Sequence, residues 1–329
     1  MKTIALFFGG PGSESMVSLM SAKNVIKYFD YKRYHLVLIY WNPVDRAFYQ
    51  VQNIEKLANL KKRLEIKDFS KLFDAALLMT HGRYGEDGIL QSILESQLIK
   101  YCGCGVLSSA LCMDKAIFKN YLAAKKIRQT KYAVLDFELD KENELLAKQK
   151  NILHKFKMPI YIKPANSGSS LGITRVNQKK DFSAALKIAR QYDKKIVIEE
   201  GLVGPQEIEM AIIGNKNLEI SEPGELRLVK DFYDYDDKYK LGKTEIIVPA
   251  KLSKAIKLKL QKRAIELYRF FACRGFARLD FFVVKNEIYV NEINTLPGFT
   301  DISMFPVLMM NKGMSYREIL NKIIDFAFQ

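Results

Sequence analysis

The feature that most constrains the fold is a pair of apolar runs near the C-terminus, separated by a very short connection. The first run covers residues 279–283, the second covers 288–293, and Lys285-Asn286-Glu287 joins them. Apolar residues that recur on both sides of a tight connection predict two strands of a β-hairpin. The fold must therefore contain an antiparallel strand pair in this region.

Polar residues interrupt this predicted hairpin at four positions, Arg278, Asp280, Glu292 and Asn294. Two carboxylates and an amide oxygen on adjacent strands suit Mg²⁺, which completes its octahedron with water and substrate phosphate oxygens. Arg278 points to the same face as Asp280 because side chains alternate along a strand. A lone strand-edge carboxylate is usually only solvated. Four polar residues followed by Thr-Leu-Pro-Gly instead favour a magnesium site.

The N-terminal third alternates between buried strands, at 3–8, 34–41 and 74–80, and helical patterns. This alternation predicts an α/β layer with a parallel sheet, whose ligands lie at the carboxyl ends of the strands. Two polar loops follow such strands. The glycine turn after the strand at 3–8 contains Glu14, a carboxylate suited to a cation or a substrate ammonium group. The strand at 74–80 is followed by the loop HGRYGEDG at 81–88.

A second set of signals concerns phosphate binding. The segment 159–176 reads as strand, glycine-serine loop and strand, with Lys163 inside the first strand. Backbone amides and hydroxyls of such a loop can approach phosphate, although the pattern is not a Walker A motif because no Gly-Lys-Ser/Thr follows. One helix is expected over 107–126. The long segment 221–247, rich in Tyr and Asp, is expected to be an irregular lid.

Composition excludes several classes of protein. A chain of 329 residues predicts two or three domains. No apolar run is long enough to cross a membrane, and the N-terminus reaches its glycines too early for a signal peptide. The net charge of +15 is spread over helix surfaces without an arginine-rich tract, so nucleic acid is not an expected partner. The cysteines, at 102, 104, 112 and 273, have no metal-ligand spacing, which favours a reducing cytoplasm.

Taken together and in order, seven motifs closely resemble those of the D-alanine:D-alanine ligases of the ATP-grasp superfamily. They are HGRYGEDG, MDK, KPANSGSSLGI, EEGL, FYDYDDKY, GFARLDFF and NEINTLPGFT. The resemblance implies an α/β, three-domain ATP-grasp architecture with an N-terminal parallel-sheet domain at 1–106. A central subdomain with the glycine-serine flap would follow at 107–202, and a C-terminal subdomain with the lid and the magnesium site at 203–329.

The same resemblance implies a reaction and its cofactors. Two D-alanine molecules would be joined to D-alanyl-D-alanine through an acyl phosphate, with release of ADP and phosphate, for peptidoglycan synthesis in the cytoplasm. The implied cofactors are ATP and two Mg²⁺ ions, with Mn²⁺ as an alternative. A homodimer is the implied assembly, with no membrane partner.

Motif by motif, the resemblance also implies roles for individual residues. The two metal ions would be bound by Asp280, Glu292 and Asn294. The residues that would contact the ATP phosphates are Lys115, Lys163, Ser170 and Lys238. Glu199 and Leu202 would meet the adenine, and Glu207 the ribose.

The remaining residues would bind the two amino acids. Glu14 would hold the ammonium group of the first D-alanine, with Ser169 and Tyr239 as its hydrogen-bonded partners when the lid closes. Arg278 and the Gly298 amide would stabilise the oxyanion. Ser303 would hold the carboxylate of the second D-alanine.

Departures from the family pattern leave alternatives open. Ser15 and Met16 stand where the family usually has His and Glu, and Gln206 precedes Glu207. A D-alanine:D-serine or D-alanine:D-lactate ligase is the main alternative, against which Tyr239 weighs. Another ATP-grasp ligase that joins a carboxylate to an amine is the second. The third alternative is a catalytically silent nucleotide-binding or nucleic-acid-binding protein. The presence of Asp280, Glu292, Asn294 and Arg278 argues against it.

Overall fold

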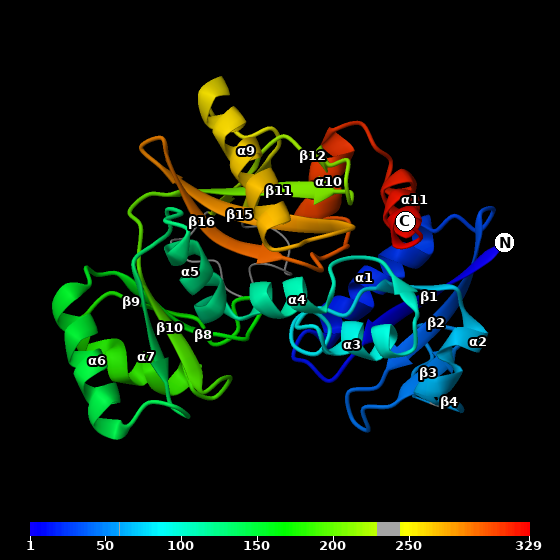
Figure 1. Cartoon of the computed structure of the whole chain (residues 1–329), viewed down its shortest axis with the longest axis horizontal. Coiled ribbons are helices and arrows are strands. Elements are labelled where there is room, and N and C mark those ends of the chain that lie inside the picture. The colour runs from blue at the N-terminus through cyan, green and yellow to red at the C-terminus, as the bar shows by residue number, and fades with distance from the viewer. Residues whose placement is uncertain (59, 229–243) are drawn as a thin grey trace.

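The computed structural model describes residues 1–58, 60–228 and 244–329, which form three β-sheets flanked by helices (Figure 1). The sheets follow one another along the chain, and each occupies a lobe of its own. None of the helices in these segments has the length and apolar character that a bilayer span needs. The expected α/β fold class is confirmed.

The first sheet has the strand order β4-β3-β2-β1-β5-β6. Its strands are β1 (Lys2–Gly9), β2 (Tyr34–Trp41), β3 (Phe48–Val51), β4 (Lys62–Leu64), β5 (Ala75–Leu78) and β6 (Lys100–Tyr101). The three predicted strands are present and mutually parallel. The sheet is mixed, because β3 and β4, which were not predicted, pair antiparallel. The short connection from β2 to β3 cannot provide the crossover that a parallel pair requires.

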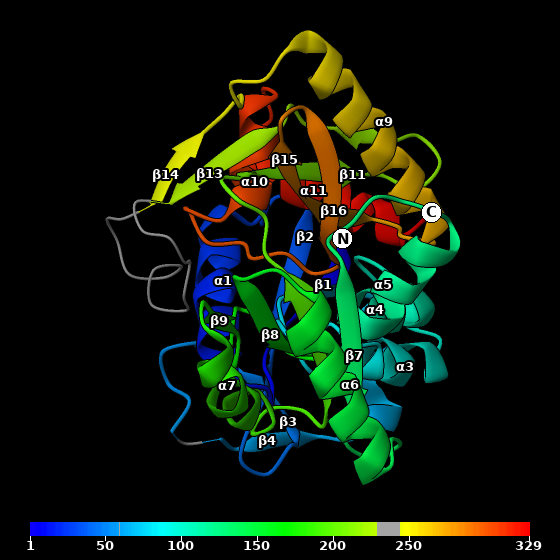
Figure 2. The same cartoon turned by 90° about the vertical axis from the view of Figure 1, so that its left-hand side faces the viewer.

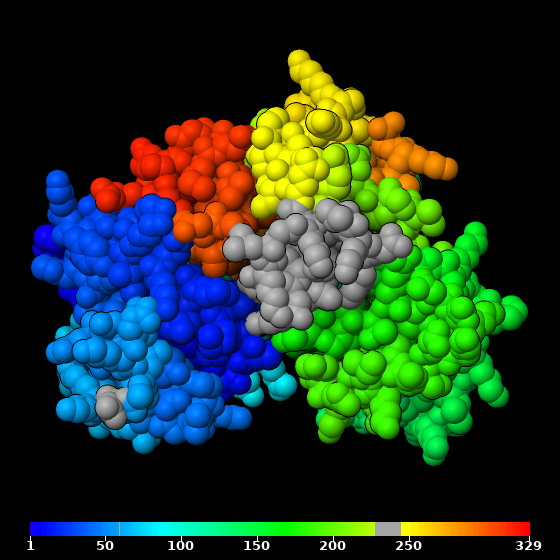
Figure 3. All heavy atoms as spheres, turned by 180° about the vertical axis from the view of Figure 1, so that it is seen from behind, coloured from blue at the N-terminus to red at the C-terminus, as the bar shows by residue number. Residues whose placement is uncertain are grey.

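Helices from both ends of the chain cover this first sheet. They are α1 (Ser15–Tyr28), the short η1 (Ile66–Asp68) and α2 (Phe69–Leu72), α3 (Ile89–Ser96) and, from the C-terminus, α11 (Tyr316–Ala327). Helix α11 packs against α1, β5 and β6. Its Ile319 and Ile323 are fully buried in the same core cluster as Ile4 and Leu77 of the sheet. The C-terminal residues, red in Figure 3, therefore lie beside the blue N-terminal residues.

The second sheet is antiparallel, with the order β7-β10-β8-β9. It consists of β7 (Tyr132–Asp136), β8 (Ile160–Pro164), β9 (Thr174–Val176) and β10 (Lys195–Glu200). Helices α6 (Glu142–Lys155) and α7 (Phe182–Ala189) contribute to a separate core cluster with one face of this sheet, and the short η2 (Lys179–Asp181) precedes α7. The glycine-serine loop connects β8 to β9, as the sequence predicts.

The helix expected over 107–126 is two helices, α4 (Val106–Met113) and α5 (Lys115–Ala124). The break lies at Asp114, whose backbone is extended and whose side chain accepts hydrogen bonds from the Ala116 and Ile117 amides. Asp114 is therefore an N-cap, a role that short acidic side chains perform well. The cap starts α5 at Lys115, which places this lysine at the edge of the cleft described below.

The third sheet is antiparallel, with the order β14-β13-β11-β15-β16 and β12 beside β11. The strands are β11 (Gln206–Ile213), β12 (Glu219–Ile220), β13 (Gly224–Leu228), β14 (Thr244–Ile247), β15 (Phe276–Val284) and β16 (Glu287–Asn294). Helix α9 (Lys254–Phe270) packs on one face, as Figure 2 shows, and α10 (Met304–Asn311) follows the last strand. The segment 221–247, expected to be irregular throughout, contains the paired strands β13 and β14. The predicted lid residues between them lie outside the described residues.

The predicted C-terminal hairpin is confirmed, and its turn is the pair Lys285 and Asn286, both with positive φ. A β-bulge follows: Asp280 pairs with Glu292, whereas the next residue, Phe281, pairs with Val290. The extra residue on β16 is Asn291. Because of this inserted residue, Val290 packs in the core while Glu292 stays opposite Asp280. The apolar side chains of the hairpin therefore remain on its core face, and the charged ones remain on the other face.

Candidate active site

Two adjoining cavities lie where the three sheets meet, with volumes of about 280 Å³ and 160 Å³. Loops after β1 and β5, together with loop 295–304, line the larger cavity. Strand β8 and residues 199–202 line the smaller one. The two cavities share a set of wall residues, namely Lys115, Ser170, Ile173, Glu209, Leu226, Arg278 and Glu292. A molecule in one cavity can therefore meet a molecule in the other at a charged wall.

The charged wall is built by three neighbouring strands. Asp280 of β15 lies between Glu209 of β11 and Glu292 of β16, while Arg278 lies between Ala211 and Asn294. Arg278 donates from Nε to Asp280 Oδ1 at 2.8 Å and from Nη2 to Asp280 Oδ2 at 2.7 Å. The predicted alignment of Arg278 and Asp280 on one face is confirmed. Burial opposes the charge of Arg278, but Asp280 and Glu209 hold its pKa well above the usual value.

The donor set of this wall fits a hard divalent cation. Asn294 donates through Nδ2 to Asp280 Oδ2 at 2.9 Å, so its amide oxygen is the atom suited to a metal. Glu292 lies opposite Asp280 and 3.8 Å from Lys115 Nζ. Within residues 1–58, 60–228 and 244–329, no three His, Cys, Asp or Glu side chains are arranged as a metal site. Two carboxylates and one amide match the small protein share of a magnesium site that relies on phosphate oxygens.

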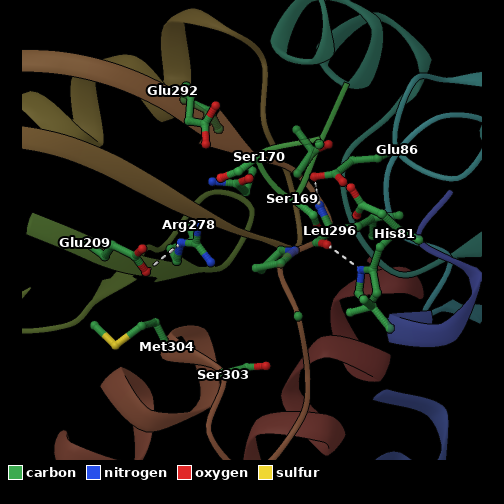
Figure 4. Close-up of a pocket in the computed structure, with 18 of the residues that line it drawn as sticks. His81, Glu86, Ser169, Ser170, Glu209, Arg278, Glu292, Leu296, Ser303 and Met304 are labelled. Atoms are coloured by element: carbon green, nitrogen blue, oxygen red, sulfur yellow. Dashed lines mark hydrogen bonds and ion pairs between the residues drawn. The ribbon is translucent and has the colours of Figure 1, made fainter. Parts of the chain in front are cut away.

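The glycine-serine loop lies over the shared wall. Ser169 and Ser170 have φ values of 47° and 60°, in the left-handed region that side chains rarely adopt. Such strained residues persist where surrounding contacts determine them, and they cluster at ligand clamps. Lys115 supports the loop by donating from Nζ to the Ser167 carbonyl at 2.7 Å. The loop thus presents its amides and hydroxyls to the junction of the two cavities (Figure 4).

A buried charge network lies behind the smaller cavity. The Glu199 carboxylate is 3.1 Å from Lys119 Nζ and 3.0 Å from Lys163 Nζ, and it accepts a hydrogen bond from Thr130 Oγ1 at 2.7 Å. Burial opposes ionisation of Glu199, yet the two lysines and Thr130 hold its pKa far below the usual value. The Glu199 side chain is therefore committed to lysines. Any contact between this residue and a nucleotide base would come from its backbone.

Lys119 is a site residue that the sequence reasoning missed. Its side chain is only 2% exposed. Burial lowers its pKa, while Glu199 works in the opposite direction. The available signal was its position four residues after Lys115, on the same face of α5, which also contains the buried Phe118 and Leu122.

Glu14 lines the larger cavity at the start of α1. Its carboxylate packs closely against two glycines. A Cβ on Gly168 would lie 2.2 Å from Glu14 Oε1, and a Cβ on Gly82 would lie 2.9 Å from its Cδ. A side chain at either position would therefore displace the Glu14 carboxylate. The contacts bring together the loop after β1, the loop after β5 and the glycine-serine loop, two of which were predicted to meet at the carboxyl ends of the strands.

The loop after β5 also holds the loop that follows β16. Glu86 Oε1 accepts a hydrogen bond from the Leu296 amide at 3.2 Å, and His81 Nδ1 lies 2.9 Å from the Leu296 carbonyl oxygen. Ser21 of helix α1 accepts a hydrogen bond through its Oγ from the Phe299 amide at 3.2 Å. Residues 296–299, which include Gly298, are thus fixed by side chains from the first sheet's loops and helix α1. Figure 4 shows Leu296 between His81 and Glu86.

Gly298 and Ser303 lie close together at the wall of the larger cavity. A Cβ on Gly298 would lie 2.8 Å from Ser303 Oγ. Ser303 Oγ accepts from the Thr300 amide at 2.9 Å, which holds the hydroxyl at the cavity wall. Leu202 and Glu207 line the smaller cavity. The assigned roles of all these residues stay predictions, and Lys238 and Tyr239 lie outside the described residues.

Glu86 should make the stability of the protein depend on pH. Burial, with a smaller effect of the Glu14 carboxylate, raises its pKa to about 7. The folded state then keeps a proton that the unfolded chain releases near pH 4.5, so Glu86 stabilises most below that pH and this contribution is lost as the pH rises through about 7. Burial lowers the pKa of His81 to about 4, which acts in the opposite direction below pH 6.5. Above pH 6.5 the Glu86 effect should therefore dominate.

We expect the free energy of unfolding to fall by on the order of 1–2 kcal/mol between pH 6 and 8 through Glu86. Urea denaturation of the wild type and of Glu86→Gln over this range measures the effect. The variant should lose this decline, because only the opposing effect of His81 remains, whereas Glu55→Gln, which removes an exposed ion pair with Lys23, should keep the wild-type decline. Parallel profiles for the wild type and Glu86→Gln would contradict the prediction.

Comparisons with known proteins agree with the geometry. The chain matches the family model "D-ala D-ala ligase N-terminus" over residues 3–104 and the model "D-ala D-ala ligase C-terminus" over residues 122–325. It is 37% identical to a D-alanine–D-alanine ligase of Caldicellulosiruptor bescii, over 99% of this chain and 95% of the relative.

Solved structures show the same likeness. The VanG D-Ala:D-Ser ligase of Enterococcus faecalis has a TM-score of 0.87 and 32% identity, covering 99% of both chains. The D-alanine-D-alanine ligase of Coxiella burnetii has a TM-score of 0.82 and 29% identity, covering 99% of this chain and 95% of that one. A Bacillus anthracis D-alanine–D-alanine ligase complexed with ATP has a TM-score of 0.78 and 28% identity, covering 100% and 98%.

Proposed function

Because the chain belongs to the D-alanine–D-alanine ligase family, we propose that it joins two D-alanine molecules into D-alanyl-D-alanine at the expense of ATP. The larger cavity holds the amino acids, and the smaller one holds the nucleotide. The product is a precursor for peptidoglycan, and the reaction takes place in the cytoplasm. The expected homodimer remains part of this proposal.

The shared wall of the two cavities is the observation that carries the proposal. Lys115, Ser170, Arg278 and Glu292 face both cavities. A carboxylate in the larger cavity and a triphosphate in the smaller one would meet at this wall. Phosphoryl transfer depends mainly on positioning and on neutralisation of charge, and lysine, arginine and flap amides are suited to both tasks.

The residues of the larger cavity bind and orient the two amino acids. Glu14, at the start of α1, attracts the ammonium group of the first D-alanine, whose carboxylate then points to the shared wall. Ser169 contacts this molecule from the flap. Ser303, at the start of α10, holds the carboxylate of the second D-alanine, so its amine faces the first molecule.

Arg278 and the Gly298 amide act on the bond-forming step. Transfer of the γ-phosphoryl group turns the first carboxylate into an acyl phosphate, and the second amine attacks its carbonyl carbon. Negative charge develops on the carbonyl oxygen, and donors already aimed at this oxygen stabilise the transition state. Phosphate then leaves, and the amide bond is complete.

Asp280, Glu292 and Asn294 would hold the divalent ions in this site. Bound Mg²⁺ supplies positive charge that neutralises the phosphate oxygens as charge shifts between them. Lys163 adds charge on the nucleotide side, with its position fixed by Glu199. Leu202 and the backbone of residue 199 meet the adenine, and Glu207 the ribose. Lys238 and Tyr239 belong to the proposal as lid residues.

Release of ADP tests the proposal directly. Purified protein with ATP and Mg²⁺ should release ADP when D-alanine is added, and chromatography should detect D-alanyl-D-alanine. L-Alanine serves as the matched control, because it has the same groups with the opposite hand. A rate with D-alanine that does not exceed the rate without amino acid would contradict the proposal.

A D-alanine:D-serine ligase is the second candidate, since the VanG D-Ala:D-Ser ligase shares the fold with a TM-score of 0.87. An equimolar mixture of D-alanine and D-serine, with mass detection of both dipeptides, separates the candidates. We expect D-alanyl-D-alanine as the main product. D-Lactate in the same assay tests depsipeptide formation.

A further inference from the structure

We propose that Glu209 is a positioning residue for Arg278, which keeps the guanidinium group aimed at the reacting carbonyl when Asp280 binds metal. This inference rests on the proposed function and deepens it. Figure 4 shows the Glu209 carboxylate and the Arg278 guanidinium pointing toward one another at the cavity. None of the sequence motifs considered above includes a role for Glu209.

The strand register brings Glu209 to Arg278. Glu209 of β11 lies directly opposite Asp280 of β15, and Ala211 lies opposite Arg278. The small Ala211 side chain leaves the guanidinium room to lean along the sheet toward Glu209. Glu209 Oε2 lies 2.8 Å from Arg278 Nε, and the two side chains are only 9% and 17% exposed. An ion pair with so little water around it is screened weakly.

The contact between Arg278 and Glu209 differs in kind from the contact between Arg278 and Asp280. The Nε–H and Nη2–H groups of Arg278 donate their hydrogen bonds to Asp280, whereas the Glu209 oxygen lies beside Nε as an ion-pair partner. In the proposed function, however, the oxygens of Asp280 also serve a metal ion. Positive charge there weakens them as acceptors for a second cation. Glu209 is then the acceptor that remains next to Nε.

A third metal ligand is the alternative role for a carboxylate at this position. The contact of the Arg278 guanidinium with both Glu209 and Asp280 does not by itself separate the two roles. The geometry argues against a third ligand, because no cluster of three carboxylates suited to a metal occurs within the described parts of the chain. The two roles predict different effects on metal binding, so an experiment can separate them.

A double-mutant cycle of Glu209→Ala and Arg278→Ala tests the inference. In the wild-type background, Glu209→Ala should lower kcat for dipeptide formation about 100-fold, since a misplaced catalytic group has effects of that order. In the Arg278→Ala background, it should lower kcat by less than about twofold, because a residue acting through another loses its effect when that residue is gone. Glu209→Gln keeps the shape and an oxygen acceptor, and should lose only about tenfold.

Two further readouts separate positioning from other roles. Binding of Mn²⁺ in the presence of ADP, followed by electron paramagnetic resonance, should be unchanged in Glu209→Ala and weakened in Asp280→Ala. The KM for ATP should change less than about threefold, because a positioning residue for Arg278 affects kcat and not ATP binding. Glu287→Gln is the control, because it removes the exposed pair with Arg128 on the same hairpin. Circular dichroism melting identifies any variant that fails to fold.

The outcomes are distinct. Equal losses from Glu209→Ala in both backgrounds, a loss of Mn²⁺ affinity, or wild-type kcat in Glu209→Ala would each overturn the positioning role while leaving the ligase activity in place. If Glu209→Ala fails to fold, Glu209→Gln in both Arg278 backgrounds decides the question. A wild-type protein that releases no ADP with D-alanine would overturn both proposals.

Discussion

Replacing Arg278 with alanine is expected to lower kcat by about two to three orders of magnitude, with little change in the KM for ATP. The guanidinium group is held in place by Asp280, at 2.8 and 2.7 Å, and by Glu209, at 2.8 Å. In the proposed reaction, its charge acts on the oxyanion that appears only in the transition state. Removal of such a donor typically costs about 2.7–4 kcal/mol of barrier. Steady-state kinetics of ADP release measure the change.

The same substitution also removes the positive charge between three carboxylates. Glu209, Asp280 and Glu292 lie opposite one another on three neighbouring strands, so their repulsion increases when Arg278 is lost. Arg278→Lys controls for this effect, since it keeps the charge but loses the planar fork. The lysine variant should fold like the wild type and still be slow. Turnover near the wild-type rate in both variants would remove Arg278 from the mechanism.

The hairpin shows how far local pattern predicts this site. Alternation predicted both strands, and the polar exceptions predicted the face that contains Arg278, Asp280, Glu292 and Asn294. The bulge at Asn291 was missed, although the sequence contains its signal: Val290 and Ile293 are three residues apart, which breaks the period of two. This polar face was predictable because all its members lie on one connected hairpin.

Residues that reach the site from elsewhere were not predictable in the same way. Glu209 belongs to β11, and only the pairing of β11 with β15 places it beside Arg278. Glu86 contacts Leu296 across more than two hundred positions of the chain. A single sequence contains no periodic signal for such contacts, because they depend on how separate sheets meet.

Local chemistry explains the other differences between expectation and structure. The apolar pattern of 107–126 continues through Asp114, so it predicted one helix. The side chain of Asp114 competes for the backbone amides and starts a new helix there. Similarly, the Tyr- and Asp-rich composition of 221–247 concealed the strands β13 and β14 at its ends. The composition of a segment averages over all its residues, whereas the strand pairing here involves only the residues at its two ends.

Replacing Glu199 with glutamine is expected to reduce the free energy of unfolding by about 3–5 kcal/mol, because it leaves buried charge without compensation. Glu199 lies 3.1 Å from Lys119 and 3.0 Å from Lys163. Lys119→Met should cost less, since Glu199 then keeps Lys163 as its partner. Glu138→Gln, which removes an exposed pair with Lys194, should change stability by less than about 1 kcal/mol. Urea denaturation at pH 7 compares the three variants.

The pH dependence of the Glu199→Gln variant provides the sharper test. Burial already lowers the pKa of Lys119 below its usual value, and the Glu199 carboxylate opposes this shift. Without Glu199, the folded state should release a lysine proton that the unfolded chain keeps up to about pH 10.5. The unfolded state then binds more protons, so stability rises with pH in this range. The deficit of Glu199→Gln should therefore shrink between pH 7 and 10. A deficit that stays constant would mean that lost packing, rather than uncompensated charge, is its cause.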